Sequence, residues 1–382
     1  MKRKRILLLG STGSIGINAL EVLSEKKDLF EITGLAAHRN EYLLLEQATR
    51  FGVTNLALSG VKPKDPRIRY HGQEGLLRLI EDSDAEIVLN GISGAAGFLP
   101  SMKSIQTGKH LALANKETLV MAGELVQKEA GKRGVSILPV DSEHSAVFQL
   151  MTRFEKDTIE AVVLTASGGA FRDLPKEQLS SVTPAMALNH PTWSMGKKIT
   201  IDSASLANKG LEVIEAHHLF DLPPERIHVV IHPQSYVHSM VETKDGNFYA
   251  QIGKPDMRIP ILNALSYPAI LSHTMGKLSF RNLQLNFTEP DMEKYPMLPL
   301  AYQALRKGGT YPLVYNAANE VAVEAFLQGR IPFTGIPKLV EETLGWCDWP
   351  VHIESLETVL DTDDRSRAVT EAILVQGKVQ VL

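Results

Sequence analysis

The sequence of 382 residues predicts an α/β protein whose N-terminal part is a doubly wound parallel sheet. Three observations carry this prediction. Short apolar runs typical of buried strands alternate with helical patterns from residue 5 to residue 140. A glycine-rich turn joins the first strand to the first helix. Farther along the chain, apolar residues recur at helical spacing from Leu298, which predicts a helical C-terminal part.

The predicted strands of the first sheet are apolar runs bounded by glycine or polar residues. They cover residues 5–10, 30–37, 53–58, 85–90, 109–113 and 135–140. The helical patterns between them cover residues 17–23, 40–51, 73–82 and 116–132. Strands that alternate with helices are joined by crossovers, so the sheet is expected to be parallel. Beyond it we expect a helix over 142–152, a strand over 159–164, a helix over 213–220, a connection over 270–296, and helices from 298 and over 353–375.

The turn after the first strand has three glycines at regular spacing, Gly10-Ser-Thr-Gly13-Ser-Ile-Gly16. Glycine lets the backbone approach a pyrophosphate, and the N-terminus of the following helix offers free N–H groups and the positive end of its dipole. The spacing differs from the commoner G-x-G-x-x-G pattern, and a purely structural turn is the alternative. Its position between strand and helix favours a dinucleotide site.

The end of the second strand indicates which dinucleotide is bound. NAD enzymes usually place an acid there to hold the ribose 2′-hydroxyl. The segment here is His38-Arg39-Asn40, which has one guanidinium and no acid. Arg39 suits a 2′-phosphate, so the sequence favours NADP; a solvated loop charge is the alternative.

Two carboxylates follow the last strand of the sheet, where open α/β sheets bind ligands. Asp141 and Glu143 are two residues apart, so in an extended segment both project to one side. Neighbouring anions repel unless a cation lies between them or one is protonated. A hard divalent ion such as Mg²⁺ or Mn²⁺ is therefore a natural partner. The alternative is that Asp141 only caps the helix over 142–152.

Two polar loops follow the strand over 159–164. Ser167-Gly168-Gly169 can surround a phosphate with N–H and hydroxyl donors, or can be a plain turn. The segment 190–196 contains His190, Trp193 and Met195 among proline and glycine, a composition that fits a mobile lid over a ligand. The alternative for the tryptophan is simple packing.

A third polar segment precedes the predicted helix over 213–220. Ser203, Asn208 and Lys209 combine neutral donors with one cation, which suits a phosphate monoester. Glu212 opens the helix and could supply a third metal carboxylate. A capped helix with surface polar residues is the alternative.

The amino-acid composition excludes several classes of protein function. The 40 Lys and Arg against 44 Asp and Glu give a net charge of −4, which argues against a general nucleic-acid binder. The single cysteine, Cys347, excludes an intrachain disulfide framework, and its tryptophan neighbours suggest a packed thiol.

No apolar run reaches about 18 residues, so we expect no membrane span. The apolar run after the basic start is short for an export signal. We therefore expect the mature protein to begin at residue 1, in a reducing cytoplasm.

Taken together, these blocks resemble the 1-deoxy-D-xylulose 5-phosphate reductoisomerase family. The matching stretches run in order over most of the chain: GSTGSIG (10–16), ANKETLV (114–120), LPVDSEHSAVFQ (138–149), LTASGGAF (164–171), HPTWSMGKKITIDSASLANKGLE (190–212), KPDMRIPI (254–261) and VYNAANE (314–320). The resemblance implies a Rossmann-like N-terminal domain, a central α/β catalytic domain and a C-terminal α-helical domain. The expected boundaries are 1–141, 142–270, a linker over 271–296, and 297–382.

The resemblance also implies roles for individual residues. The implied catalytic set is Lys116, Asp141, Glu143 and Glu212, of which the three acids hold the metal, as Mg²⁺, Mn²⁺ or Co²⁺. The implied substrate site is Lys116, Ser142, Glu143, Ser167, His190, Trp193, Ser203, Asn208, Lys209, Glu212 and Met257. The implied NADPH contacts are Thr12, Gly13, Ser14, Ile15, His38, Arg39, Asn40, Asn115, Glu117, Met195 and Gly196.

The implied reaction isomerises 1-deoxy-D-xylulose 5-phosphate and reduces the product with NADPH to 2-C-methyl-D-erythritol 4-phosphate, a step of non-mevalonate isoprenoid synthesis. A homodimer without nucleic-acid or membrane partners is expected. The alternative enzyme is an NADP-dependent dehydrogenase of another phosphorylated sugar or hydroxyketone, which would need no three-carboxylate metal site. A nucleotide-sensing regulatory protein is the non-enzyme alternative, and the acidic site argues against it.

Overall fold

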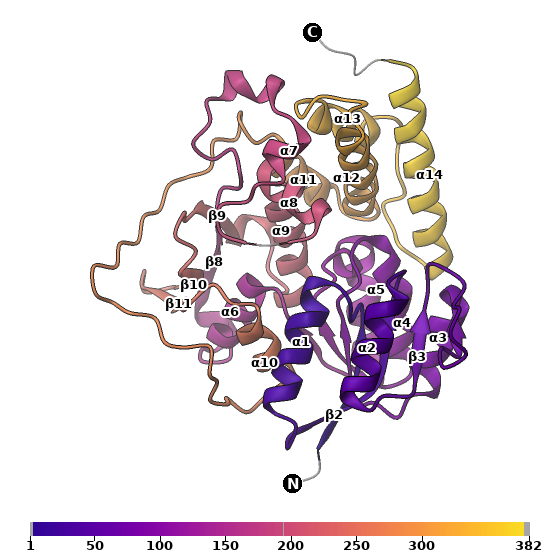
Figure 1. The fold of residues 1–382 in the computed structure, drawn as a ribbon. Helices are drawn as coiled ribbons and strands as arrows, with labels where there is room; N and C mark the ends of the chain where they lie inside the picture. Colours follow the sequence, from indigo (N-terminus) through magenta and orange to yellow (C-terminus); the bar gives the residue numbers. More distant parts are fainter. Residues whose placement is uncertain (1–2, 194, 378–382) are drawn as a thin grey trace. The chain divides into compact units, whose positions relative to one another are not determined.

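A computed structural model describes residues 3–193 and 195–377 (Figure 1). The expected start of the chain and the last residues of the predicted helical domain, 378–382, lie outside the described residues. The chain divides into two compact units. Unit 1 comprises residues 1–118, 126–145 and 256–277, and unit 2 comprises residues 119–125, 146–255 and 278–382. Two helices, α5 (Glu117–Arg133) and α6 (Ser142–Met151), contribute residues to both.

Unit 1 is built on a seven-stranded parallel sheet. Its strands are β1 (Lys4–Leu9), β2 (Phe30–Ala37), β3 (Leu56–Leu58), β4 (Tyr70–His71), β5 (Ile87–Asn90), β6 (His110–Leu113) and β7 (Ile137–Pro139). Its helices are α1 (Ser14–Glu25), α2 (Glu41–Phe51), α3 (Gly72–Asp82), α4 (Phe98–Gln106) and α10 (Arg258–Ser266), besides its part of α5. The strands are almost wholly buried, as expected when helices cover both faces of a parallel sheet.

The strand order of this sheet is β4-β3-β2-β1-β5-β6-β7. The order reverses between β1 and β5, whose last residues, Leu9 and Asn90, are paired in register. Ligands of open α/β sheets bind beyond the carboxyl ends of the strands at such a reversal. The glycine turn that follows β1 therefore lies at the expected place for a dinucleotide.

Unit 2 contains a smaller mixed sheet of order β11-β10-β8-β9. Its strands are β8 (Ile159–Ala166), β9 (Ile227–Ile231), β10 (Val237–Thr243) and β11 (Phe248–Ile252). β8 and β9 are parallel, whereas β10 runs antiparallel to β8 and β11. Short 3₁₀ turns at 156–158, 176–181 and 224–226 connect the elements.

Helices supply most of the core of unit 2. They are α7 (Pro184–Ala187), α8 (Lys197–Ser205), α9 (Ala207–Phe220), α11 (Met297–Lys307), α12 (Tyr311–Leu327), α13 (Gly335–Leu344) and α14 (Leu356–Val375), with part of α6. α12 is buried along most of its length and packs against α9, α11, α13 and α14 (Figure 1). The composition of α12 explains its buried position, since the helix carries apolar residues on all of its faces.

The predicted fold class is confirmed, and the differences concern element boundaries and elements that were not predicted. The strand expected over 53–58 is only β3, because the chain enters it from the C-cap Gly52 in the left-handed conformation. The helix expected from 213 begins at Ala207, so Asn208, Lys209 and Glu212 lie within α9 rather than before it. The elements that were not predicted are α4 and β4, then α7, α8, β9, β10 and β11, and finally α10.

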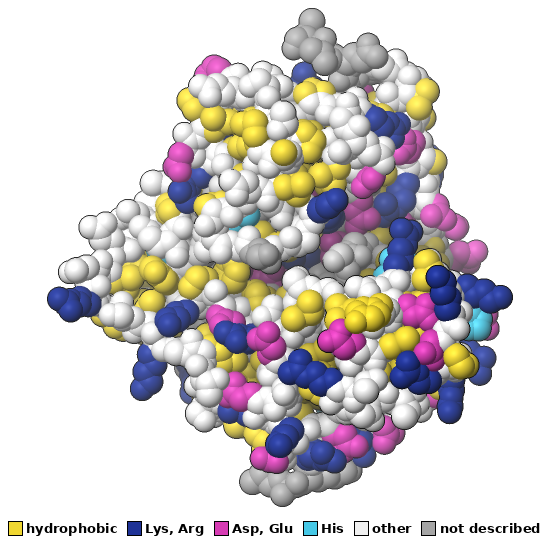
Figure 2. Space-filling view, viewed as in Figure 1, with side chains coloured by type: hydrophobic (Ala, Val, Ile, Leu, Met, Phe, Trp, Pro, Cys, Tyr) yellow, Lys and Arg dark blue, Asp and Glu magenta, His cyan; other side chains and the backbone are white. Residues whose placement is uncertain are grey.

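The surface carries both charge signs. Figure 2 shows Lys and Arg side chains interspersed with Asp and Glu on the viewed face, in keeping with the near balance of charges. Among the described residues, no helix has the length and apolar character needed to cross a bilayer.

Candidate active site

The glycine turn after β1 forms a tight bend in which two of the glycines have no room for a Cβ. Gly10 has a φ of +78°, and a Cβ there would lie 2.8 Å from the carbonyl oxygen of Gly91. A Cβ on Gly16 would lie 2.3 Å from the carbonyl oxygen of Gly10. Gly13 is the N-cap of α1 and supplies no side chain to cap its N–H groups, and it is exposed together with Ser14. The bend thus presents the helix N-terminus to a ligand, as dinucleotide sites do.

The three predicted contacts after β2 have different surroundings. His38 packs on Gly60, where a Cβ would lie 2.2 Å from the imidazole ring, and its Nδ1 lies 3.1 Å from the hydroxyl of Ser59. Asn40 caps α2, because its Oδ1 accepts the backbone N–H of Leu43 at 3.1 Å. Arg39 is exposed between them. The exposed guanidinium fits a 2′-phosphate contact.

The turn from β6 into α5 contains two further predicted cofactor contacts, Asn115 and Glu117. The Asn115 amide donates to the carbonyl of Ile92 at 2.8 Å and to Oε2 of Glu117 at 2.9 Å. Its Oδ1 accepts the Thr118 hydroxyl at 2.6 Å and the Thr118 N–H at 3.1 Å. Both side chains are buried and hold the turn in shape. A cofactor contact at Asn115 would therefore use its main chain.

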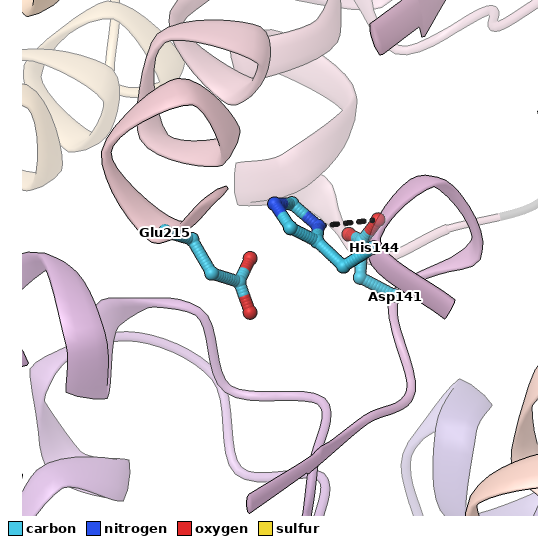
Figure 3. A group of neighbouring side chains, drawn as sticks. All are labelled: Asp141, His144 and Glu215. Atoms are coloured by element: carbon cyan, nitrogen blue, oxygen red, sulfur yellow. Dashed lines mark ion pairs between the residues drawn. The ribbon is translucent and has the colours of Figure 1, made fainter. Parts of the chain in front are cut away.

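Lys116, next to this turn, forms a nearly buried ion pair. Its Nζ donates to Oδ2 of Asp141 at 2.7 Å, and the two side chains are 6% and 13% exposed. Nδ1 of His144 lies 3.2 Å from the other carboxylate oxygen of Asp141 (Figure 3). The backbone N–H of Glu143 donates to that same oxygen at 3.2 Å. Asp141 therefore caps α6, as the alternative proposed, and also binds Lys116.

The other members of this segment continue the polar cluster. The Ser142 hydroxyl donates to Oε2 of Glu143 at 2.5 Å, and both side chains are half-buried. His144 was not among the predicted residues, and it is fully buried. The spacing of Asp141 and His144, three apart at a helix start, is the sequence signal that could have indicated it.

In unit 2, the structure brings together three residues from separate segments. Nε2 of His190 lies 3.0 Å from the hydroxyl of Ser167 and 3.2 Å from the hydroxyl of Ser203. Ser167 follows β8, and Ser203 lies on α8. Ser167 also accepts the N–H of Gly169 at 3.3 Å. Hydroxyls clustered in this way, with neighbouring N–H groups, suit a phosphate.

The hydrogen bonds of His190 fix its tautomer. Nδ1 accepts the backbone N–H groups of Thr192 at 3.1 Å and Trp193 at 2.9 Å. The neutral ring must then carry its proton on Nε2 and donate it to a serine oxygen. The hydroxyl proton of that serine is then directed at another acceptor. Burial, and secondly the nearby Arg172, lower the pKa of His190 below 6.5. The neutral form is therefore favoured.

Three predicted residues lie within the first two turns of α9. The Lys209 ammonium and the Asn208 amide both donate to the carboxylate of Glu212, one to each oxygen. Lys209 and Glu212 are 3% and 1% exposed. Glu212 does not open the helix as expected, because α9 starts five residues earlier and its first turn supplies the donors. The group joins a cation, a neutral donor and an anion inside the protein.

The remaining predicted residues are half-buried or lie in loops. Trp193 and Met195 are half-buried in the irregular segment before α8, and Gly196 is the N-cap of α8. Met257 is the N-cap of α10 in unit 1 and is half-buried. Its neighbours Asp256 and Arg258 are ion-paired at 2.6 Å, which lowers the pKa of Asp256.

The fold and these groups define a class of protein. A glycine turn at the reversal of a parallel sheet, an exposed arginine after β2, and separate clusters of carboxylates and hydroxyls are typical of a dinucleotide-dependent enzyme of phosphorylated substrates. Comparisons with known proteins refine this class. Family profiles described as 1-deoxy-D-xylulose 5-phosphate reductoisomerase match residues 6–123, and those described as its C-terminal domains match residues 137–220 and 252–369.

Similar proteins extend over nearly the whole chain. The 1-deoxy-D-xylulose 5-phosphate reductoisomerase of Treponema denticola is 47% identical over 374 residues, which is 97% of each chain. That of Prosthecochloris aestuarii is 49% identical over 352 residues, 89% of this chain and 92% of the relative. The chain belongs to the 1-deoxy-D-xylulose 5-phosphate reductoisomerase family.

Solved structures agree with this membership. The enzyme from Zymomonas mobilis in complex with NADPH superimposes with a TM-score of 0.89 at 38% identity, over 98% of this chain and 99% of that one. A reductoisomerase in complex with NADPH, fosmidomycin and magnesium gives a TM-score of 0.91 at 38% identity, over 97% and 98% of the chains. The predicted family and the predicted fold class are both confirmed.

Proposed function

We propose that this chain converts 1-deoxy-D-xylulose 5-phosphate to 2-C-methyl-D-erythritol 4-phosphate, with its reacting groups at the residues that the sequence predicted. Identity of 47% over 97% of the chain to a reductoisomerase is the observation that carries the activity. The chain is thus an NADP-dependent oxidoreductase that also uses a divalent metal, as predicted. Nothing in the comparisons favours the alternative dehydrogenase.

NADPH fits the first unit. The bend has no room for a Cβ at Gly10 or at Gly16, and α1 begins within it at Ser14, which suits a pyrophosphate. We assign Thr12, Gly13, Ser14 and Ile15 to that contact. Arg39, exposed after β2, supplies a cation for the 2′-phosphate. His38, Asn40, Asn115 and Glu117 shape these segments and, with Met195 and Gly196, complete the proposed cofactor set.

We assign the divalent metal to Asp141, Glu143 and Glu212. Oxygen donors with net negative charge are the ligands that Mg²⁺ and Mn²⁺ prefer, and these three residues supply only carboxylates. When bound, such an ion polarises a carbonyl and its neighbouring hydroxyl as a Lewis acid. Magnesium is named for three of the solved relatives. Manganese and cobalt share this ligand preference and are part of the proposal.

Lys116 has a separate task in this mechanism. The reaction breaks the C3–C4 bond of the sugar and forms a bond to C2, after which the new aldehyde accepts hydride. Negative charge builds up on oxygen during these steps, and a nearly buried ammonium stabilises it more strongly than one in water. Asp141 orients the ammonium, and the Lys116 Nζ can pass a proton to that oxygen.

The phosphate group is assigned to unit 2. Ser167, Ser203 and the neutral His190 offer hydroxyl and N–H donors, and Asn208 and Lys209 add an amide and a cation. His190 holds the N–H groups of Thr192 and Trp193, so the phosphate site and the segment over 190–196 are connected. Phosphate binding, distant from the reacting carbons, then orients the substrate and excludes water through Trp193 and Met195.

The proposal also covers the domain boundaries, the location and the partners of the protein. We propose the division at residues 141, 270 and 296, a reducing cytoplasmic location, no nucleic-acid partner, and a homodimer. An edge strand supports the dimer: β11 ends the small sheet and exposes Phe248 at 55%, Tyr249 at 41% and Ile252 at 40%. Sedimentation at several concentrations tests it, and a constant monomer mass contradicts it.

The activity has a direct test. NADPH oxidation is followed with 1-deoxy-D-xylulose 5-phosphate in the presence of Mg²⁺ or Mn²⁺, and again after chelation. We expect turnover with metal and none without it. Absence of turnover with metal would reject the proposed function, whereas turnover in chelator would reject only the metal assignment.

A further inference from the structure

The segment VYNAANE on α12 was singled out by the sequence, and the reaction described above does not use it. It lies in the buried middle of α12, and two of its asparagines, Asn316 and Asn319, are fully buried. Buried amides cost free energy unless they are hydrogen-bonded, so a specific contact is expected of each. Asn319 contacts α8, whereas Asn316 donates to Glu320 within α12; another residue of the segment, Tyr315, contacts α9.

The first neighbour is α8, through a buried carboxylate. Asp202 is 1% exposed and immediately precedes Ser203. Its Oδ1 accepts the amide of Asn319 at 2.8 Å, and its Oδ2 lies 3.0 Å from the ammonium of Lys198, one turn earlier on α8. A carboxylate with a cation on one oxygen and an amide on the other is held in one orientation. Asp202 therefore connects α8 to α12 at the position of Ser203.

The second neighbour of α12 is the start of α9. A Cβ on Gly210 would lie 2.8 Å from the hydroxyl of Tyr315 and 2.6 Å from the Cβ of Ala301. The Tyr315 hydroxyl in turn donates to the carbonyl of Met297 at 3.1 Å. The backbone of α9, one residue after Lys209, thus lies against the end of the Tyr315 side chain of α12 and against Ala301 of α11.

A sharp corner joins these two anchored helices. Leu206, between α8 and α9, has a φ of +57°, a left-handed conformation that is costly for leucine. Ser205 braces it, because its Oγ donates to the carbonyl of Asp202 and accepts the N–H of Ala207, each at 3.3 Å. The corner sets the spacing between Ser203 on one helix and Asn208 and Lys209 on the other. Strained backbone of this kind persists only where its surroundings hold it.

We infer that Asn319 and Asp202 are positioning residues for the phosphate site. By holding α8 to α12, the Asn319–Asp202 hydrogen bond keeps Ser203 in register with Asn208 and Lys209 across the Leu206 corner. This inference rests on the proposed function for the identity of the ligand. According to this inference, the C-terminal helices affect substrate affinity without contacting the substrate.

The test replaces the amide in the full-length protein. Asn319→Leu keeps the volume and removes the donor, and we expect the KM for 1-deoxy-D-xylulose 5-phosphate to rise about fivefold or more, with the KM for NADPH within about twofold. Binding of inorganic phosphate, measured by calorimetry, is expected to weaken similarly without any turnover. Asn316→Leu is the matched control, because Asn316 is equally buried on α12 and donates to Glu320 rather than to α8.

An exchange of the pair adds a second criterion. Asp202→Asn and Asn319→Asp each disrupt the hydrogen bond, whereas the double variant restores an amide–carboxylate pair in reversed order. We expect the double variant to have a KM for the sugar phosphate closer to wild type than either single variant. Equal effects of Asn316→Leu and Asn319→Leu, or no recovery in the double variant, would overturn the inference. Absence of turnover in the wild-type enzyme would instead reject the proposed function, and the phosphate affinities would still decide the positioning role.

Discussion

The ammonium of Lys116 lies 2.7 Å from Oδ2 of Asp141, and both side chains are largely withdrawn from solvent. Asp141 follows β7, and Lys116, the N-cap of α5, follows the neighbouring strand β6. Carboxyl ends of adjacent parallel strands meet at one edge, so the sheet itself brings the pair together. The same carboxylate is the first of the three assigned to the metal, which links the position of the cation to that of the lysine.

Replacing Lys116 tests its part in the reaction. Lys116→Met keeps most of the side-chain volume and removes the charge, and we expect kcat to fall by about 100-fold or more because a charge-stabilising donor is lost. The KM for NADPH should change little. Lys132→Met on the exposed end of α5 is the control, with wild-type kcat expected. A wild-type kcat in Lys116→Met would remove Lys116 from the mechanism.

Glu212 is predicted to act through its charge. Glu212→Gln preserves shape and the ability to accept a hydrogen bond, so we expect the rate at fixed Mg²⁺ to fall more than about tenfold and to recover partly at high Mg²⁺. Glu225→Gln changes an exposed carboxylate in the same unit and serves as the control. Steady-state rates over a Mg²⁺ series check this. An unchanged Mg²⁺ dependence in Glu212→Gln would exclude it as a ligand.

The choice of cofactor should depend on Arg39. Arg39→Asp replaces a cation suited to the 2′-phosphate with an acid suited to a 2′-hydroxyl, so the ratio of kcat/KM for NADPH over NADH should fall by about tenfold or more. Arg50→Gln, on the exposed end of α2, controls for loss of a nearby positive charge. The same ratio in all three proteins would mean that Arg39 does not contact the phosphate.

The neutral state of His190 predicts a pH dependence of stability. Its pKa in the folded protein is lowered from 6.5, so the unfolded chain binds the proton first as pH falls. The stability that His190 contributes is therefore fully present above pH 6.5 and is lost as pH drops through that value toward the lowered pKa. Urea denaturation of wild type and His190→Gln between neutral and mildly acidic pH should show their difference shrinking on acidification. A constant difference would contradict the lowered pKa, and so the neutral state, of His190 in the folded protein.

Gly169 and Gly246 both have a positive φ, but only Gly169 is also crowded by its neighbours. Its φ is +68°, and a Cβ there would lie 2.4 Å from the carbonyl oxygen of Ser203. Gly246 also has a positive φ, +80°, but a Cβ there would meet nothing within 4 Å. We expect Gly246→Ala to cost about 1 kcal/mol, from backbone conformation alone, and Gly169→Ala to cost at least about 1 kcal/mol more and to weaken phosphate binding. Equal costs by chemical denaturation would mean that the loop adjusts freely.

Most of the fold could be predicted from local patterns in the sequence. The strand over 30–37 was predicted with the bounds that the structure gives, because an apolar run and its flanking polar residues define it locally. The start of α9 was missed because Asn208 and Lys209 are polar and lie before the apolar run, whereas in the structure the neighbouring Gly210 packs on Ala301 of α11 and Tyr315 of α12. Tertiary contacts override local preference at such positions.

The candidate site was predicted by residue type rather than by contact. Asn115 was expected at the cofactor; its side chain hydrogen-bonds Ile92 after β5 and Thr118 in its own turn, so a cofactor contact by its main chain stays a prediction. The Asn319–Asp202 bond was not predicted, because partners 117 residues apart leave no local signature. His144 was also missed, although its spacing of three from Asp141 is a local signal. Spacing reveals neighbours on one element, whereas contacts between elements need the fold.

The central claim is that Asp141, Glu143 and Glu212 hold one divalent cation. Titration of the full-length protein with Mn²⁺, followed by electron paramagnetic resonance of the free ion, measures this directly. We expect one tight site per chain in the wild type, and affinity weakened by about tenfold or more in Asp141→Asn and in Glu212→Gln alike. Mn²⁺ binding by Glu212→Gln with wild-type affinity would contradict the claim.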